Sequence, residues 1–192
     1  VHPSLPVNSV AELIAYEHAH EGQVNYGTGN VASIVMSAEM DMQTKSHTLQ
    51  VPYKGEVPAM TDFVAGRIQR MFATPVNALP FVKEGKLKAL AALSDKRSPL
   101  LPATPTWAES GMRELSIVPW AGLFGPEHLP AHITQRLSSA LVEILQSPDI
   151  ASEMAKLGFE PAGSSPDALA AYTKIQLKAW HTAIHSAGLN PE

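Results

Sequence analysis

The chain of 192 residues contains no cysteine. This absence excludes disulfides, thiolate nucleophiles and thiolate-bound metals, but it leaves the cellular compartment open. No apolar run is long enough to cross a bilayer, and the first residues lack the basic start and apolar core of a signal peptide. Acidic residues outnumber basic ones, 18 to 14, and no basic run occurs, so the charge footprint of a nucleic-acid-binding protein is missing.

Short apolar segments alternate with segments of helical periodicity along most of the chain. This alternation predicts an α/β fold with a largely parallel sheet. Strands are expected near residues 23–26, 48–53, 70–73, 87–93, 118–124 and 159–162. Helices are expected near residues 9–20, 30–42, 59–65, 76–84 and 133–144, and after the Ser-Pro-Asp triplets at 147–149 and 165–167.

A proline-rich connection between residues 99 and 106 separates the two parts of the chain. The part before about residue 118 has enough strands and helices for one α/β lobe. The part that follows offers one or two strands and three helices, which are too few for a sheet covered on both faces. We therefore expect the second lobe to be incomplete.

The first candidate site is the turn Tyr26-Gly27-Thr28-Gly29-Asn30, which is followed by Ser33 in the next predicted helix. A strand that leads into a helix through glycines presents unpaired backbone N–H groups at the positive end of the helix dipole. Such a turn favours an anion, and the short polar side chains add hydrogen-bonding groups. The alternative interpretation is an ordinary capped turn.

The same stretch matches the dinucleotide-binding pattern G-x-G-x-x-A through Gly27, Gly29 and Ala32. Glu56 follows the next strand, near the place of a ribose-binding acid. Two observations count against this hypothesis: the motif is not at the first strand of the chain, and Lys54-Gly55 follows the second strand directly. A nucleotide-cofactor-binding domain nevertheless stays open as an alternative.

Two further turns end predicted strands, where open α/β sheets bind their ligands. Tyr53, Lys54 and Gly55 form the first turn, in which the tyrosine could stack or hydrogen-bond and the lysine could attract a carboxylate. Ala73, Thr74 and Pro75 form the second. The alternatives are a solvated surface lysine and simple capping of a helix by the threonine.

No catalytic motif is recognisable, and no metal site is predicted. The pairs His128/His132 and His181/His185 have the i, i+4 spacing that can place two ligands on one helix face, but no third ligand completes either set locally. Exposed histidines are the preferred interpretation. We therefore expect neither an enzyme nor a bound cofactor.

Several ordered stretches resemble the substrate-binding receptors of tripartite tricarboxylate transporters, also called Bug-type receptors. The resemblance is carried by NSVAELIAY (8–16), NYGTGN (25–30), VPYKG (51–55), GKLKALA (85–91), RSP (97–99), PTWAESG (105–111) and WAGLFGP (120–126). The P-Y-K-G and W-x-G-L-F segments together are specific, whereas single motifs would not be.

The resemblance implies a type II periplasmic-binding-protein fold, in which two lobes close like a Venus flytrap around a small mono-, di- or tricarboxylate. It places residues 8–118 in lobe 2 and residues 1–7 and 119–192 in the C-terminal part of lobe 1. In this family two strand-to-helix loops hold the ligand, and the loop in this chain would be residues 26–33, flanked by the turns at 53–55 and 73–75. The implied location is the periplasm, with membrane transporter subunits as partners.

Two features depart from the family pattern. The first third of the family sequence, with its signal peptide and one ligand loop, has no counterpart here. We therefore expect weak or absent binding unless a partner chain supplies the rest, and we expect a homodimer through the incomplete lobe. Val31, Ala32 and Val35 also stand where many members have a Gly-Ser pair and a histidine. A degenerate receptor fragment that makes only protein contacts is the third hypothesis.

Overall fold

The computed structural model describes residues 1–94, 96–115, 117, 119–186 and 188. The chain forms two units: unit 1 comprises residues 1–118 and 183–192, and unit 2 comprises residues 119–182. The predicted lobe boundary also lies at residue 118, but the predicted division of the chain into lobes stays a prediction. The assignment of residues 1–7 and 119–192 to one lobe stays a prediction, and in the structure residues 1–7 belong to unit 1.

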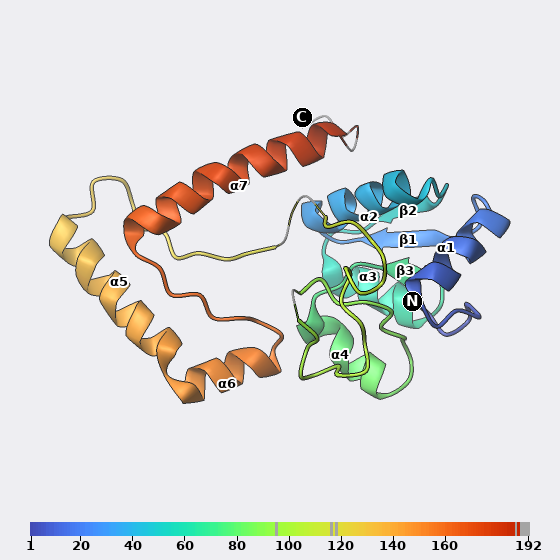
Figure 1. The fold of residues 1–192 in the computed structure, drawn as a ribbon, viewed down its shortest axis with the longest axis horizontal. Helices are drawn as coiled ribbons and strands as arrows, with labels where there is room; N and C mark the ends of the chain where they lie inside the picture. Colours follow the sequence, from blue (N-terminus) through green and yellow to red (C-terminus); the bar gives the residue numbers. More distant parts are fainter. Residues whose placement is uncertain (95, 116, 118, 187, 189–192) are drawn as a thin grey trace. The chain divides into compact units, whose positions relative to one another are not determined.

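Unit 1 contains a sheet of three parallel strands, which are β1 (Asn25–Thr28), β2 (Leu49–Pro52) and β3 (Arg70–Met71). The strand order is β2-β1-β3, so β1 lies in the centre (Figure 1). Its residues are paired with β2 from Asn25↔Leu49 to Thr28↔Pro52 and with β3 at Tyr26↔Arg70. The predicted α/β class with a parallel sheet is confirmed.

The helices of unit 1 are α1 (Val10–Ala19), α2 (Val31–Thr44), α3 (Glu56–Val64) and α4 (Pro75–Lys83). Helix α1 begins where the sequence predicts, because the Ser9 hydroxyl accepts a hydrogen bond from the N–H of Glu12 at 3.1 Å. Helix α3 begins three residues before the expected Ala59. Gly55, with φ at 132°, turns the chain sharply there, and the helix includes Pro58 in its first turn, where proline is tolerated.

An apolar cluster beneath the sheet consists of Met60, Phe63, Ile68 and Leu87, each at most 4% exposed. Val51, Tyr53, Met71 and Ala73 pack against it from the strand ends. The cluster therefore joins α3 to β2 and β3, and it supports the turns that follow these two strands.

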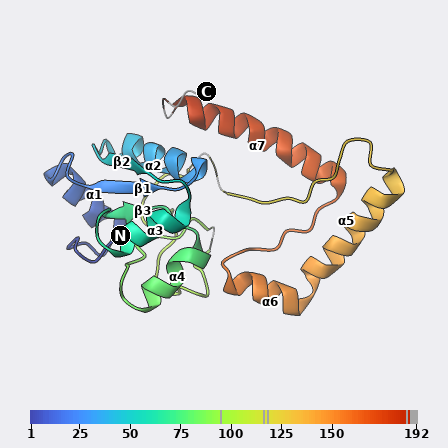
Figure 2. The same ribbon diagram turned by 180° about the vertical axis from the view of Figure 1, so that it is seen from behind.

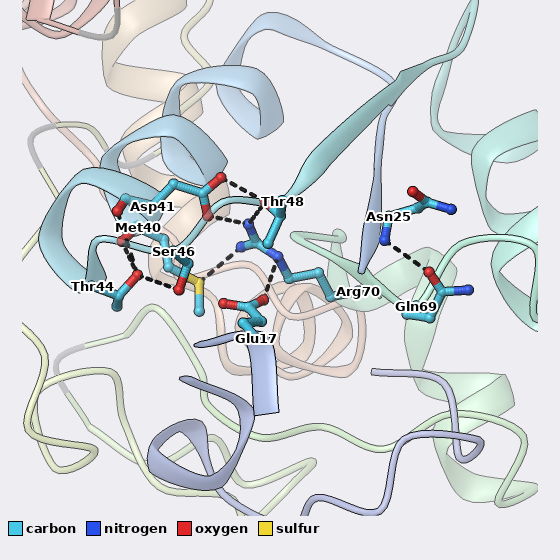
Figure 3. Close-up of polar contacts among 9 residues, drawn as sticks. All are labelled: Glu17, Asn25, Met40, Asp41, Thr44, Ser46, Thr48, Gln69 and Arg70. Carbon is cyan, nitrogen blue, oxygen red and sulfur yellow. Dashed lines mark hydrogen bonds and ion pairs between the residues drawn. The ribbon is translucent and has the colours of Figure 1, made fainter. Parts of the chain in front are cut away.

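A buried ion-pair network occupies another part of unit 1 (Figure 3). The Arg70 side chain is 4% exposed, and its Nε lies 3.0 Å from Glu17, whose side chain is fully buried. The same guanidinium contacts the carboxylate of Asp41 and donates to the Thr48 hydroxyl at 2.7 Å. It also lies over the ring of Tyr26, 4.8 Å from the centroid.

The strand expected at residues 87–93 is not formed. Only Ala92 makes an isolated parallel bridge, to Thr106. The apolar character that suggested a strand reflects burial, since Leu87 and Leu90 are 3% and 9% exposed. A buried apolar run cannot be distinguished from a strand by its composition alone.

The edge of β3 is instead occupied by the start of the chain. The N–H of His2 donates to the carbonyl of Gln69 at 2.9 Å, and Val1 and Lys88 exchange two backbone hydrogen bonds of 2.7 and 2.8 Å. The first two residues therefore lie between the β3 segment and Lys88. This arrangement keeps residues 87–93 from extending the sheet.

Unit 2 contains α5 (Ala131–Gln146), α6 (Pro148–Lys156) and most of α7 (Pro166–Ser186). Only Ser147 separates α5 from α6, whereas a non-helical segment joins α6 to α7 (Figure 2). Within unit 2 the ring of Trp120 contacts Phe124 at 6.3 Å and the edge of Tyr172 at 5.2 Å, measured between ring centroids. No residue from 119 to 182 is buried. Unit 2 therefore has no core of its own among these residues, and the incompleteness of the second lobe stays a prediction.

The strands expected at residues 118–124 and 159–162 are absent from the part of unit 2 that the structure describes, which includes 119–124 and 159–162 but not Val118. Leu123, Phe124 and Phe159 are more than half exposed. An apolar segment forms a strand only where another strand pairs with it, and none of the described residues of unit 2 provides one.

Truncating the core beneath the sheet should destabilise unit 1. Phe63 is 2% exposed and central to the apolar cluster, so Phe63→Ala is expected to lower the free energy of unfolding by about 3–5 kcal/mol. Leu49→Ala is the control, because Leu49 is 53% exposed. Urea denaturation followed by circular dichroism would measure both variants. Equal losses would contradict this description of the core.

The buried carboxyl of Glu17 should make stability depend on pH. Burial raises the pKa of Glu17 above its ordinary value of 4.5, and the charge of Arg70 opposes this rise. The folded protein therefore holds the proton more tightly than the unfolded chain, and the contribution of Glu17 to stability decreases as the pH rises from 4.5 through the raised pKa. The wild type should lose stability relative to Glu17→Gln over this window.

Urea denaturation of both proteins between pH 4 and pH 8 would measure the difference. Glu21→Gln is the control, since Glu21 is exposed. If the difference in unfolding free energy between wild type and Glu17→Gln stays constant from pH 4 to pH 8, the assignment of a raised pKa to Glu17 is contradicted.

Candidate functional site

The three predicted ligand turns, residues 26–33, 53–55 and 73–75, lie at the C-terminal ends of the three parallel strands. β1 leads into α2, β2 into α3, and β3 into α4. The first two turns are in direct contact: the N–H of Tyr53 donates to the carbonyl of Thr28 at 2.8 Å. A β-carbon added to Gly29 would lie 2.5 Å from the backbone of Gly55 and Glu56. Glycine at this position therefore allows the two turns to approach each other.

The N-terminus of α2 is closed by a reciprocal cap. The side chain of Asn30 accepts from the N–H of Ser33 at 2.8 Å, and the Ser33 hydroxyl accepts from the N–H groups of Gly29 and Asn30 at 3.2 and 3.3 Å. The N–H groups of Val31 and Ala32 come next, and neither makes a hydrogen bond to any described residue. These two groups are donors available to an anion.

The turn between β2 and α3 combines one exposed cation with a tyrosine that is already bonded. Lys54 is exposed. The Tyr53 hydroxyl donates to Asp62 on α3 at 2.8 Å. This bond and a second one from Arg67 hold the pKa of Asp62 below its ordinary value, whereas burial and the bond to Asp62 raise that of Tyr53. Gly55 offers no side chain to cap α3, and the N–H of Val57 finds no acceptor among the described residues.

The turn between β3 and α4 is joined to α3 by a carboxylate. Oε1 of Glu56 accepts from the backbone N–H of Thr74 at 2.5 Å and from its hydroxyl at 2.8 Å. The Thr74 hydroxyl in turn accepts from Asn77 at 3.1 Å. Glu56, from the first turn of α3, therefore caps α4 and bridges the second and third turns.

The structure gives the predicted site residues different surroundings. Asn30, Lys54 and Pro75 are exposed, and Gly29, Tyr53, Gly55, Ala73 and Thr74 are half-buried around the strand ends. The remaining four are buried, namely Tyr26, Gly27, Thr28 and Ser33. Among these four, the Tyr26 ring packs against Arg70, and Thr28 accepts from Gln50 at 2.9 Å. A ligand role for each of the twelve residues stays a prediction.

Sequence reasoning did not select Glu56 or Asp62 for this region. Glu56 was considered only as a ribose-binding acid, whereas its carboxylate is bonded to Thr74. A usable signal was present, because an acidic residue directly after a glycine turn is favoured in the first turn of a helix. Nothing in the sequence indicated which neighbouring helix its carboxylate would cap.

The histidine pairs differ in the structure. His181 and His185 both lie on α7. His128 precedes α5, with φ at 66°, so it does not share a helix face with His132. Among the residues that the structure describes, no group of three or more histidine or acidic side chains could hold a metal ion. None of the described helices combines the length and the apolar character that a membrane span requires.

Comparison with known proteins identifies the family. The model of the tripartite tricarboxylate transporter family receptor matches residues 1–189. The chain belongs to this family. The family consists of solute-binding receptors, whose role is non-enzymatic. The membership of this chain in the family confirms the resemblance found in the sequence. The chain spans little more than half the length of the curated relatives that it matches. It covers 55% of a relative from a Pseudomonas strain and 58% of the protein BugT from Bordetella pertussis.

Solved structures show the same fold. R. palustris Rpa4515 with adipate is 27% identical to the chain, with a TM-score of 0.92 over all of this chain and 65% of that one. The periplasmic binding protein BugD is 29% identical, with a TM-score of 0.85 over 98% and 64% of the two chains. MatC from Rhodopseudomonas palustris with bound malate is 26% identical, with a TM-score of 0.79 over 93% and 63%. The predicted periplasmic-binding-protein fold is confirmed.

The contact between the first two turns should tolerate no side chain at position 29. A β-carbon there would overlap backbone atoms at 2.5 Å, so Gly29→Ala is expected to cost about 1–3 kcal/mol of unfolding free energy. Gly27→Ala is the matched control: its β-carbon would meet chiefly the end of the flexible Ile68 side chain. Thermal unfolding would rank the two variants, and a smaller loss for Gly29→Ala would contradict the described contact.

Proposed function

We propose that this chain forms the ligand-binding part of a periplasmic solute receptor that captures a small carboxylate for a tripartite tricarboxylate-type transporter. The observation that carries the proposal is the grouping of unpaired N–H donors at Val31, Ala32 and Val57 on two adjacent helix N-termini at the C-terminal edge of a parallel sheet. Backbone donors at the positive ends of helices favour an anion of carboxylate size.

The family and its solved members support the same chemistry. Two similar structures are Rpa4515 with adipate and MatC with bound malate, and both ligands are small carboxylates. The chain also presents an exposed cation, Lys54, beside the donors. A surface lysine attracts an anion over several ångströms and raises its rate of association, an effect that salt weakens.

The alternative nucleotide-binding hypothesis has less support. Its glycines, Gly27 and Gly29, are used here for close packing against Ile68, Tyr53 and the second turn. Glu56, its candidate ribose acceptor, is bonded to Thr74. In the carboxylate-receptor proposal the two glycines allow close packing of the turns, and the unpaired N–H groups of α2 and α3 bind the ligand. This proposal requires no ribose-binding acid.

Titration of the 192-residue chain with a carboxylate panel tests the proposal. The panel contains hexanoate, succinate, adipate, malate, citrate, benzoate and NAD, and thermal shift followed by calorimetry measures binding. At least one carboxylate should raise the melting temperature, and NAD should not. A response to NAD alone, or to no member of the panel, would overturn the proposal for this chain.

Lys54 provides a second test with the carboxylate that binds best. Lys54→Gln is expected to weaken that carboxylate about 3- to 10-fold at low salt, with a smaller effect at high salt, because the lost interaction is a screened surface attraction. Lys83→Gln is the matched control: Lys83 is also exposed but lies in the last turn of α4, opposite the helix end at the site. Equal effects of both variants would contradict a local role for Lys54.

A further inference from the structure

Glu56 gives the candidate site an anion of its own. Its carboxylate is held by the N–H and the hydroxyl of Thr74 at 2.5 and 2.8 Å, so the N-terminus of α4 is already occupied by a negative charge. The backbone of Glu56 also lies against Gly29, next to the turn that presents the free N–H groups of α2. Glu56 therefore lies against the turn that presents these free donors, and its carboxylate reaches from there to Thr74 on the third turn.

The charges of the three turns balance. Within residues 26–33, 53–57 and 72–77 the sequence contains one cation, Lys54, and one anion, Glu56. All three helix N-termini at the strand ends keep an unpaired backbone N–H group among the described residues, but only at α4 is the N-cap residue already bonded to a carboxylate, that of Glu56. A second carboxylate that approached the N-terminus of α4 would therefore meet the fixed negative charge of Glu56.

We infer that Glu56 is a specificity-determining residue that makes this site prefer ligands with a single carboxylate over di- and tricarboxylates. The inference rests on the proposed function and names its ligand class. A second carboxylate on the ligand would lie near the fixed charge of Glu56, and like charges in a partly hydrated site repel. Rejection by a repulsive element is a common way to discriminate between related ligands.

Hexanoate and adipate form the matched pair of probes, because both have six carbons and differ in one carboxylate. Calorimetry on the 192-residue chain should show tighter binding of hexanoate. Glu56→Gln keeps an acceptor oxygen for Thr74 and removes the charge, so it should raise the affinity for adipate relative to hexanoate by about tenfold, the effect of about one like-charge contact. Glu84→Gln removes an exposed charge at the opposite end of α4 and should leave the ratio unchanged.

The outcomes separate the two proposals. Carboxylate binding with an unchanged hexanoate-to-adipate ratio in Glu56→Gln would overturn the role of Glu56 and leave the receptor proposal intact. Binding of neither probe to either protein would overturn the inference, and silence over the whole panel would overturn the receptor proposal as well.

A second measurement needs no variant and therefore does not depend on the folding of Glu56→Gln. In the wild type the preference for hexanoate should be largest at low ionic strength and should decrease as salt screens the repulsion. A wild-type preference for adipate at low salt would overturn the inference directly.

Discussion

The guanidinium of Arg70 is the contact on which the arrangement of unit 1 depends. It starts from β3, pairs with Glu17 on α1, contacts Asp41 on α2 and bonds Thr48 just before β2 (Figure 3). It also lies over the ring of Tyr26 on β1. Four elements, α1, β1, α2 and β3, and the residue that precedes β2 thus share one buried cation. Because an unpaired buried charge is costly, the network excludes packings in which any of these elements moves away.

This constraint positions the site without taking part in it. β3 has only two residues, so its hydrogen bonds to β1 alone hold it weakly. Arg70 fixes its register opposite Tyr26, and the chain then reaches Thr74 within four residues. The apolar cluster around Phe63 and Ile68 fixes α3 from below. The bond from Thr74 to Glu56 can form only because both placements are settled, and it then ties the second turn to the third.

The sequence predicted the parts of the fold that depend on local signals. Ser9 marks the start of α1 through capping, and Pro148 marks the start of α6 through the preference of proline for the first helical position. The positions of the three strand ends follow from the alternation of strand and helix segments. It failed where an outcome depends on a distant partner. Residues 87–93 are apolar enough for a strand, but the edge that they would pair with is occupied by Val1 and His2. Residues 119–124 have no strand beside them among the described residues.

The same division applies to the site. Its glycines and polar turn residues could be found because a turn that feeds a helix has a recognisable composition, whereas the carboxylate of Glu56 is placed by a contact 18 residues away in sequence. The donors themselves are backbone groups, which any sequence with this geometry provides. Backbone donors can attract a carboxylate but cannot distinguish one carboxylate from another. Under the proposed function, the choice of ligand within this unit therefore falls to the few charged side chains on the turns, such as Lys54 and Glu56.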